Sequence, residues 1–230
     1  MDILYDRIGV LIHYGDKMIK ENIDRAWECL ENEYKDAKPA LVFNNEFELI
    51  ISVILSAQCT DVRVNKVTEK LFEKYNTPEA IAHMDIELLE EYIKSCGLYK
   101  NKAKNIKEAS VAILERFGGR VPETREELMS LPGVGRKTAN VVLSVGFGKP
   151  AFAVDTHVFR VANRIGFANG KTPDDVEKQV TALIPEEKWG KAHHWLIYHG
   201  RRVCHSRSPA CDGCCVRGYC LYAQNKDEEQ

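Results

Sequence analysis

Hydrophobic residues recur every three or four positions along most of the chain, and this periodicity predicts α-helices. Asn45 followed by Glu48 is typical of a helix start, because an asparagine side chain can accept a hydrogen bond from the backbone three residues on. A second helix is expected to end at Gly118, since glycine readily adopts the left-handed backbone of a helix C-terminus. The two hydrophobic stripes comprise Phe47, Ile50, Ile51, Ile54 and Leu55, and Ile106, Ala109, Ile113, Leu114 and Phe117.

Further helix starts follow later in the chain. Thr124 with Glu127 forms a capping box, and Pro173 with the acidic pair after it begins another helix. The run at 141–145 has the β-branched residues of a strand, but it directly follows a helix start, so we predict a buried helix there. No hairpin turn lies between alternating runs. The predicted fold class is all-α, built from many short helices.

The composition narrows the class of protein. The chain has 230 residues, 44% of them hydrophobic and 29% charged, which suffices for one large domain or two small ones. Collagen, coiled-coil and disordered classes are excluded. No run of about 18 apolar residues is present, so we expect no membrane-spanning helix. The acidic N-terminus does not resemble a signal peptide, and a cytoplasmic location is expected.

Charge is distributed unevenly along the chain. The 32 basic and 34 acidic residues give a net charge of −2, which does not predict binding to nucleic acid through a general basic field. From Lys94 to Arg217, however, 21 basic and 12 acidic residues give a net charge of +9, and the remainder carries −11. A local positive field attracts a phosphate backbone whatever the overall sum.

Five of the eight cysteines lie within 17 residues, and four follow the spacing Cys204-x6-Cys211-x2-Cys214-x5-Cys220. Such clustering in a cytoplasmic chain indicates a metal site rather than disulfides or four unmodified buried cysteines. Four thiolates suit zinc or an iron–sulfur cluster. One tight pair with two spread outer cysteines favours the bulkier cluster over zinc. Cys215 could be a ligand only in place of Cys214.

A glycine-rich turn, residues 131–137, lies between two predicted helices and reads Leu-Pro-Gly-Val-Gly-Arg-Lys. Its glycines permit positive φ and close approach of the backbone to a ligand. Backbone N–H groups at the start of the next helix form an anion site, which can hold a DNA phosphate without reading sequence. An ordinary connection between helices is the alternative. The candidate DNA contacts are Gly133, Val134, Gly135 and Arg136.

Lys137 lies in the first turn of the helix after Gly135. The positive end of the helix dipole disfavours a protonated amine, and partial burial would lower its pKa further. A neutral amine is a nucleophile that forms Schiff bases with carbonyl-like carbons. Taken alone, a lysine here is more often a phosphate contact or a solvated side chain.

Asp155 follows an apolar stretch and precedes an amphipathic helix, so we expect it to be an N-cap. A capping carboxylate at the mouth of a cleft can also direct negative charge toward a developing cation. Capping and catalysis are therefore compatible roles for this residue.

These motifs together resemble the endonuclease III family of base-excision glycosylases with a helix-hairpin-helix motif. The resemblance rests on the glycine-rich turn, on Val-Asp-Thr-His at 154–157 and on the cysteine spacing, in that order. Leu-Ser-Ala-Gln-Cys-Thr-Asp at 55–61 and Gly-Leu-Tyr at 97–99 also match. The similarity runs from about Ile23 to about Tyr222.

The resemblance implies a fold of two helical domains with a DNA cleft between them. A six-helix barrel with the helix-hairpin-helix would occupy residues 39–149. Residues 21–38 and 150–230 would form the iron–sulfur domain. Residues 1–20 extend beyond the usual family start, and we expect an added amphipathic helix there.

The resemblance also implies roles for individual residues. Lys137 occupies the position of the family's Schiff-base lysine, and Asp155 occupies that of its catalytic aspartate. A [4Fe–4S] cluster would be bound by Cys204, Cys211, Cys214 and Cys220. Gln58 and Leu98 stand where family members fill the gap that an extruded nucleotide leaves in the duplex, although from the sequence alone both are ordinary residues.

Two departures bear on this assignment. Cys59 stands where a small residue such as alanine is common. The related adenine-specific mismatch glycosylases share the fold and the cysteine spacing, but they lack a lysine at the position of Lys137 and carry a further C-terminal domain. This alternative is therefore disfavoured.

The expected function is a bifunctional DNA glycosylase and AP lyase that removes damaged pyrimidines and cleaves 3′ to the abasic site by β-elimination. The expected partner is double-stranded DNA with a damaged base or an abasic site. The enzyme would be a monomer without membrane contact, located in the cytoplasm at the nucleoid. Two alternatives are a non-catalytic iron–sulfur DNA-binding protein and a glycosylase without lyase activity.

Overall fold

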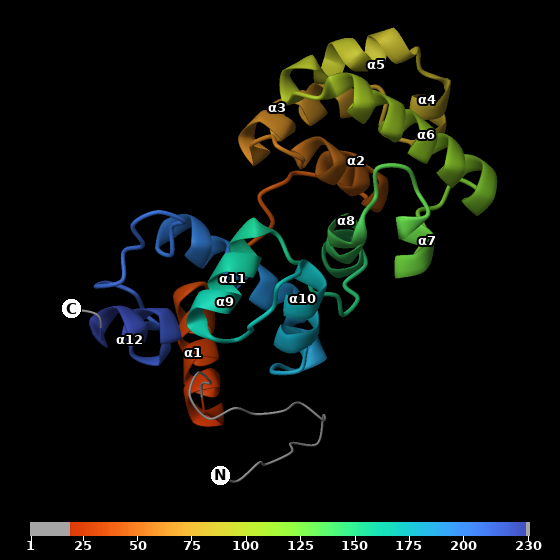
Figure 1. Cartoon of the computed structure of the whole chain (residues 1–230). Helices are drawn as coiled ribbons and strands as arrows, with labels where there is room; N and C mark the ends of the chain where they lie inside the picture. Colours follow the sequence, from red (N-terminus) through yellow and green to blue (C-terminus); the bar gives the residue numbers. More distant parts are fainter. Residues whose placement is uncertain (1–18, 229–230) are drawn as a thin grey trace. The chain divides into compact units, whose positions relative to one another are not determined.

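The computed structural model describes residues 19–228, and within them the chain forms helices and turns with no β-strand (Figure 1). The all-α prediction is therefore confirmed. Residues 1–18, nearly all of the expected N-terminal extension, lie outside the described part of the chain. No helix between residues 19 and 228 has the length and apolar character needed to cross a bilayer.

The chain divides into two compact units, which we call continuous and discontinuous. The continuous unit spans Lys38–Ala153, and the discontinuous unit joins the residues up to Ala37 with those from Val154 onward. The continuous unit contains α2 (Glu46–Ser56), α3 (Asp61–Phe72), α4 (Pro78–His83), α5 (Ile86–Ile93), η1 (Lys94–Cys96), α6 (Tyr99–Phe117), α7 (Arg125–Met129), α8 (Arg136–Val141) and the π-helical turn η2 (Val142–Gly146). The discontinuous unit contains α1 (Lys20–Glu33), α9 (Thr156–Ile165), α10 (Pro173–Thr181), η3 (Glu186–Lys188), α11 (Trp189–Arg202), η4 (Arg217–Tyr219) and α12 (Leu221–Glu228).

The predicted caps begin their helices as expected. The side chains of Asn45 and Thr124 accept hydrogen bonds from the backbone N–H of the residue three positions on. Neither pair forms a full capping box. The carboxylate of Glu48 accepts from the N–H of Asn44 rather than from that of Asn45, and the carboxylate of Glu127 accepts from the hydroxyl of Thr124 rather than from its N–H. The segment 141–145 is helical, as predicted, and continues α8 into the π-helical turn.

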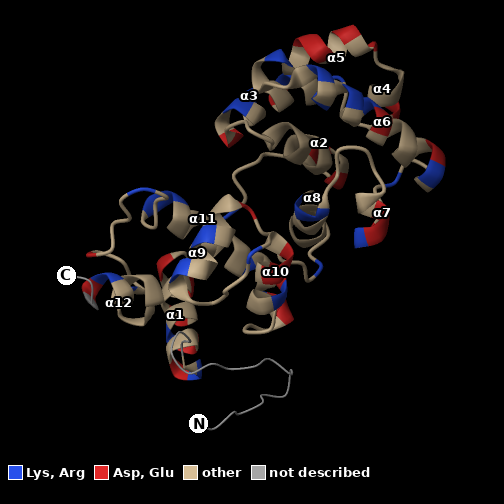
Figure 2. Ribbon diagram, in the orientation of Figure 1, with Lys and Arg blue, Asp and Glu red and all other residues tan. Residues whose placement is uncertain are grey.

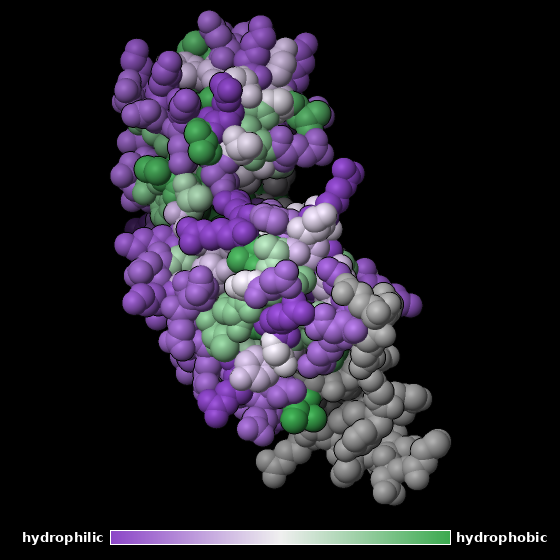
Figure 3. Space-filling view, turned by 90° about the vertical axis from the view of Figure 1, so that its left-hand side faces the viewer, coloured by the Kyte–Doolittle hydropathy of each residue, from purple (hydrophilic) through white to green (hydrophobic). Residues whose placement is uncertain are grey.

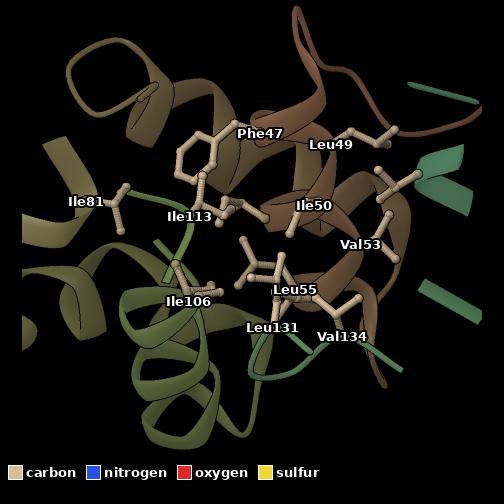
Figure 4. Close-up of a cluster of buried hydrophobic side chains, with 14 of the residues drawn as sticks. Phe47, Leu49, Ile50, Val53, Leu55, Ile81, Ile106, Ile113, Leu131 and Val134 are labelled. Atoms are coloured by element: carbon tan, nitrogen blue, oxygen red, sulfur yellow. The ribbon is translucent and has the colours of Figure 1, made fainter. Parts of the chain in front are cut away.

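The core of the continuous unit surrounds α2, which is buried from Phe47 to Leu55. Ile106 and Ile113 of α6 pack against it, together with Leu131 and Val134 from the turn between α7 and α8 (Figure 4). A helix that is mostly apolar around its circumference is stable only when it is surrounded by other elements, and this explains its central position. The packing also fixes the glycine-rich turn to the core.

Aromatic residues pack with aliphatic ones in the core of the discontinuous unit. The ring of Trp27 on α1 stacks on that of Phe167, with centroids 4.0 Å apart and planes 8° apart. Helices α9 and α11 approach closely at Gly200, where an added Cβ would lie 3.0 Å from the Cβ of His157. On the face drawn in Figure 3, hydrophilic residues predominate and hydrophobic ones occur in separate groups.

Candidate active site

The glycine-rich turn is anchored by two buried side chains and requires a glycine between them. Leu131 is 2% exposed and Val134 6% exposed. Gly133 has a φ of +76°, and an added Cβ would lie 2.9 Å from the Cβ of Asn105 on α6. Since the side chain of Val134 lies in the core, only its backbone remains available to a ligand.

The turn presents unpaired backbone donors at the start of α8. The exposed amides of Gly133 and Gly135 make no hydrogen bond to another described residue, whereas the N–H of Val134 donates to the carbonyl of Leu131 at 3.1 Å. Amides in such a turn, followed by the positive end of a helix, attract an anion. The geometry therefore suits a phosphate group.

Lys137 lies in the first turn of α8 and is exposed. Burial therefore does not add to the effect of the helix dipole on this amine. Thr138, Ala139 and Asn140 form the buried side of this helix, which places Lys137 on the opposite side. Figure 2 shows basic residues at the start of α8. An exposed amine beside unpaired amides can approach a bound phosphodiester.

Asp155 caps α9, as predicted. Its Oδ1 accepts hydrogen bonds from the N–H groups of His157 at 2.9 Å and Val158 at 2.8 Å. The other carboxylate oxygen makes no hydrogen bond to the described residues. Capping therefore fixes the orientation of the carboxylate and leaves one oxygen for a substrate.

Asp155 and Lys137 belong to different units. Within the continuous unit, the buried Asn140, three residues after Lys137, donates from Nδ2 to the carbonyl of Phe152 at 2.9 Å. Phe152 lies three residues before Asp155 in the sequence. Asn140 thus ties the helix that carries Lys137 to the segment that leads to Asp155.

Gln58 and Leu98 share a property that the sequence does not reveal. Both have left-handed backbone, with φ values of +54° and +48°, and both are exposed. Among the non-glycine residues from 19 to 228, only Ser208 is a third case of positive φ. Such conformations are strained and often mark functional positions.

The four spaced cysteines influence one another electrostatically. Burial, with smaller contributions from the negative charges of Cys220, Cys204 and Cys211, raises the pKa of Cys214 to about 11. No three His, Cys, Asp or Glu side chains in the described chain are placed to hold a single metal ion.

Cys215 lies in different surroundings from these four thiols. Burial raises its pKa to about 12, and Glu33 and Cys29 on α1 contribute along with Cys214.

Two side chains that the sequence analysis missed contact the spaced cysteines. Arg164 on α9 donates to the Sγ of Cys204 at 3.5 Å, and its carbonyl accepts from the thiol of Cys220 at 3.3 Å. His199 on α11 lies with its Nε2 3.5 Å from the Sγ of Cys214. Arg160, which lies four residues before Arg164, donates to the carbonyl of Cys204 at 3.1 Å. The spacing of these two arginines, four residues apart on one face of α9, is the sequence pattern that could have indicated the contacts with the cysteines.

Known proteins show clear similarity to this chain. Residues 51–186 match the family described as "HhH-GPD superfamily base excision DNA repair protein". The chain is 47% identical over 203 residues to "Endonuclease III" of Rickettsia conorii, covering 88% of this chain and 97% of that protein. It is 48% identical over 212 residues to "Endonuclease III" of Bacillus subtilis, covering 90% and 97%.

A solved structure of a trapped endonuclease III–DNA covalent intermediate is also similar. It is 46% identical to this chain, with a TM-score of 0.87, and the match covers 91% of this chain and 99% of that one. The similarity thus extends over both units rather than over the helix-hairpin-helix alone.

Proposed function

We propose roles for individual residues from one premise: this chain belongs to the endonuclease III family, within the HhH-GPD superfamily of base excision DNA repair proteins. It is a bifunctional DNA glycosylase and AP lyase. Neither a non-catalytic DNA-binding protein nor a glycosylase without lyase activity is favoured, because the similar solved structure is a covalent complex with DNA.

Our proposal assigns DNA binding to the glycine-rich turn. The amides of Gly133 and Gly135 and the charge of Arg136 would hold a phosphate on a duplex that contains a damaged pyrimidine or an abasic site. The backbone of Val134 would set the spacing between the two amides. Gln58 and Leu98 would fill the gap left in the base stack. Extruding a normal base from the duplex costs roughly a few kcal/mol, and extruding a lesion costs less because lesions stack and pair poorly. The enzyme would act as a monomer at the nucleoid.

Chemistry would proceed through Lys137. Its neutral amine attacks C1′ of the deoxyribose as the bond from C1′ to the damaged base breaks, and the base leaves with the bonding electrons and takes up a proton. The free oxygen of Asp155 stabilises the positive charge that develops on the sugar and accepts a proton from Lys137. The nitrogen lone pair then forms the C1′=N bond of a Schiff base as the C1′–O4′ bond breaks and O4′ takes up a proton. The Schiff base acidifies the C2′ hydrogen, and loss of that proton breaks the C3′–O bond, so that the 3′ phosphate leaves and the strand is cleaved.

A [4Fe–4S] cluster fits the four spaced cysteines, and we propose that Cys204, Cys211, Cys214 and Cys220 bind it. A cluster whose irons are all ligated by protein supplies a rigid, closed centre with no open position for substrate. Arg164 and His199 would donate to ligand sulfurs, and they would orient the loop from Cys204 to Cys220. The basic residues beside that loop would then present a fixed positive charge to DNA.

The observation that carries the proposal is the exposed amine of Lys137 beside the unpaired amides of the turn. Borohydride reduction on duplex DNA with an abasic site traps a Schiff base, so the wild type should form a covalent adduct and Lys137→Ala should not. Lys104→Ala removes another exposed lysine of the same unit and should trap at the wild-type yield. An adduct at wild-type yield in Lys137→Ala would show that the assignment is wrong.

A further inference from the structure

Lys102 is a buried cation that the mechanism above leaves without a role. It lies near the start of α6 and is only 4% exposed. Its Nζ donates to the carbonyl of Leu55 at 2.9 Å and to the carbonyl of Cys96 at 2.8 Å. Burial lowers its pKa, because removal from water disfavours the charged amine. A buried ammonium is tolerated only when it is well hydrogen-bonded, so these two contacts justify its position.

The two carbonyls belong to the two turns that carry Gln58 and Leu98. Leu55 lies in the last turn of α2, three residues before Gln58, and Cys96 ends η1, two residues before Leu98. The backbone N–H of Lys102 also donates to the carbonyl of Leu98 at 3.1 Å. A single residue therefore binds both turns.

Both turns need support from their surroundings. The left-handed backbone of Gln58 and Leu98 is unfavourable for residues with a side chain. Leu98 is 58% exposed, so it gains little from burial in the free protein. A conformation that the residue itself does not favour persists only when neighbouring groups hold it, and Lys102 is such a neighbour for both turns.

We propose that Lys102 is a positioning residue that ties the turn carrying Gln58 to the turn carrying Leu98, so that both side chains enter the base stack together. The inference rests on the roles proposed above for these two side chains. Lys102 has no part in bond breaking. Its loss should therefore impair reaction with duplex DNA and spare the Schiff-base chemistry on a strand that has no partner strand to invade.

Lys107 provides a matched control on the same helix. Its Nζ also donates to two backbone carbonyls, that of Ala82 in the last turn of α4 and that of Met84 just after this helix. No residue of that turn is assigned to DNA. Lys107→Met and Lys102→Met therefore remove the same chemical group and the same number of bonds, but from different turns.

The test compares these variants on two substrates, an abasic site in duplex DNA and the same abasic strand alone. We expect Lys102→Met to lower kcat/KM on the duplex about tenfold, and to keep borohydride trapping on the single strand within about twofold. Lys107→Met should stay within about twofold on both. Adding Lys102→Met to a Gln58→Ala, Leu98→Ala variant should change duplex activity by less than about twofold, because no side chain is left to position.

Equal losses in the two lysine variants, or a Lys102→Met loss of the same size on both substrates, would overturn the inference. Should Lys102→Met not fold, Lys102→Gln, which keeps one donor, is compared with Lys107→Gln in the same assays. Full duplex activity in the Gln58→Ala, Leu98→Ala variant would refute the roles of those residues, and the inference with them. Loss of duplex activity in the Gln58→Ala, Leu98→Ala variant, without such a loss in the Lys102 variants, would refute the inference and leave the roles of Gln58 and Leu98 intact.

Discussion

Replacing Gly133 by alanine tests whether the glycine-rich turn depends on both its backbone conformation and its contact with α6. The new Cβ would occupy a backbone with φ of +76° and lie 2.9 Å from the Cβ of Asn105. The left-handed conformation costs an alanine about 1–2 kcal/mol. Restriction of the unfolded chain returns about 0.4–1 kcal/mol. Steric overlap in a packed site adds about 1–3 kcal/mol.

The expected net loss in free energy of unfolding is therefore about 3 kcal/mol. Gly118→Ala is the control, because Gly118 has a φ of +60° and no atom within 4 Å of an added Cβ. That variant should lose only about 1 kcal/mol. Urea unfolding followed by circular dichroism gives both values by linear extrapolation.

Asn105 separates the two contributions. Asn105→Gly removes the opposing Cβ and should recover the steric part of the Gly133→Ala loss in a double-mutant cycle. Asn105→Ala keeps the Cβ at 2.9 Å and removes only Cγ and Nδ2 at 3.2 Å, so it should recover a smaller part. Equal losses in Gly133→Ala and Gly118→Ala would refute the steric argument. The turn would then need glycine for its backbone alone.

Three further predictions follow from other contacts. Asp155→Asn keeps the capping oxygen, so its free energy of unfolding should stay within about 0.5 kcal/mol of the wild type while strand cleavage is lost. Asp155→Ala should also lose about 1 kcal/mol of stability in thermal unfolding. Cleavage at the wild-type rate in Asp155→Asn would contradict the role assigned to the carboxylate. Cys211→Ser should abolish the brown colour and the iron content of about four per chain, and Cys215→Ser should keep both, as measured by visible absorbance and iron analysis; iron loss in both would contradict the four-ligand set. Burial lowers the pKa of Lys102, so just below the ordinary lysine pKa this group holds more protons in the unfolded chain than in the folded one. The stability of the wild type relative to Lys102→Met should therefore rise with pH in that window. A fall in this relative stability, measured by urea unfolding, would contradict the prediction.

Local features of the sequence could be predicted because they depend on neighbours within one helical turn. The caps at Asn45, Thr124 and Asp155 need only a side-chain oxygen two or three residues before a free N–H. The all-α class followed from the hydrophobic spacing for the same reason. These predictions survive folding because the tertiary structure adds to the local preference.

Features that depend on distant segments could not be predicted in this way. Nothing near Gln58 or Leu98 in the sequence indicates left-handed backbone. The amine of Lys102 meets the carbonyls of both turns only after the chain has folded. The exposure of Lys137 depends on which side of α8 faces the core, and a six-residue helix carries too little periodicity to show it. The iron–sulfur ligand set was suggested by spacing, whereas the contacts of Arg164 with two of its cysteines needed the structure.

The stacking of Trp27 on Phe167 has a consequence for biosynthesis. Helix α1 leaves the ribosome early, but its aromatic partners lie well over a hundred residues later, and Tyr34 meets the ring of His199 across 165 positions. The continuous unit contains all of its own core residues and can fold while translation proceeds. Helix α1 must therefore wait with its apolar face uncovered until α11 and the segment that carries the four spaced cysteines have been made, because both contact it.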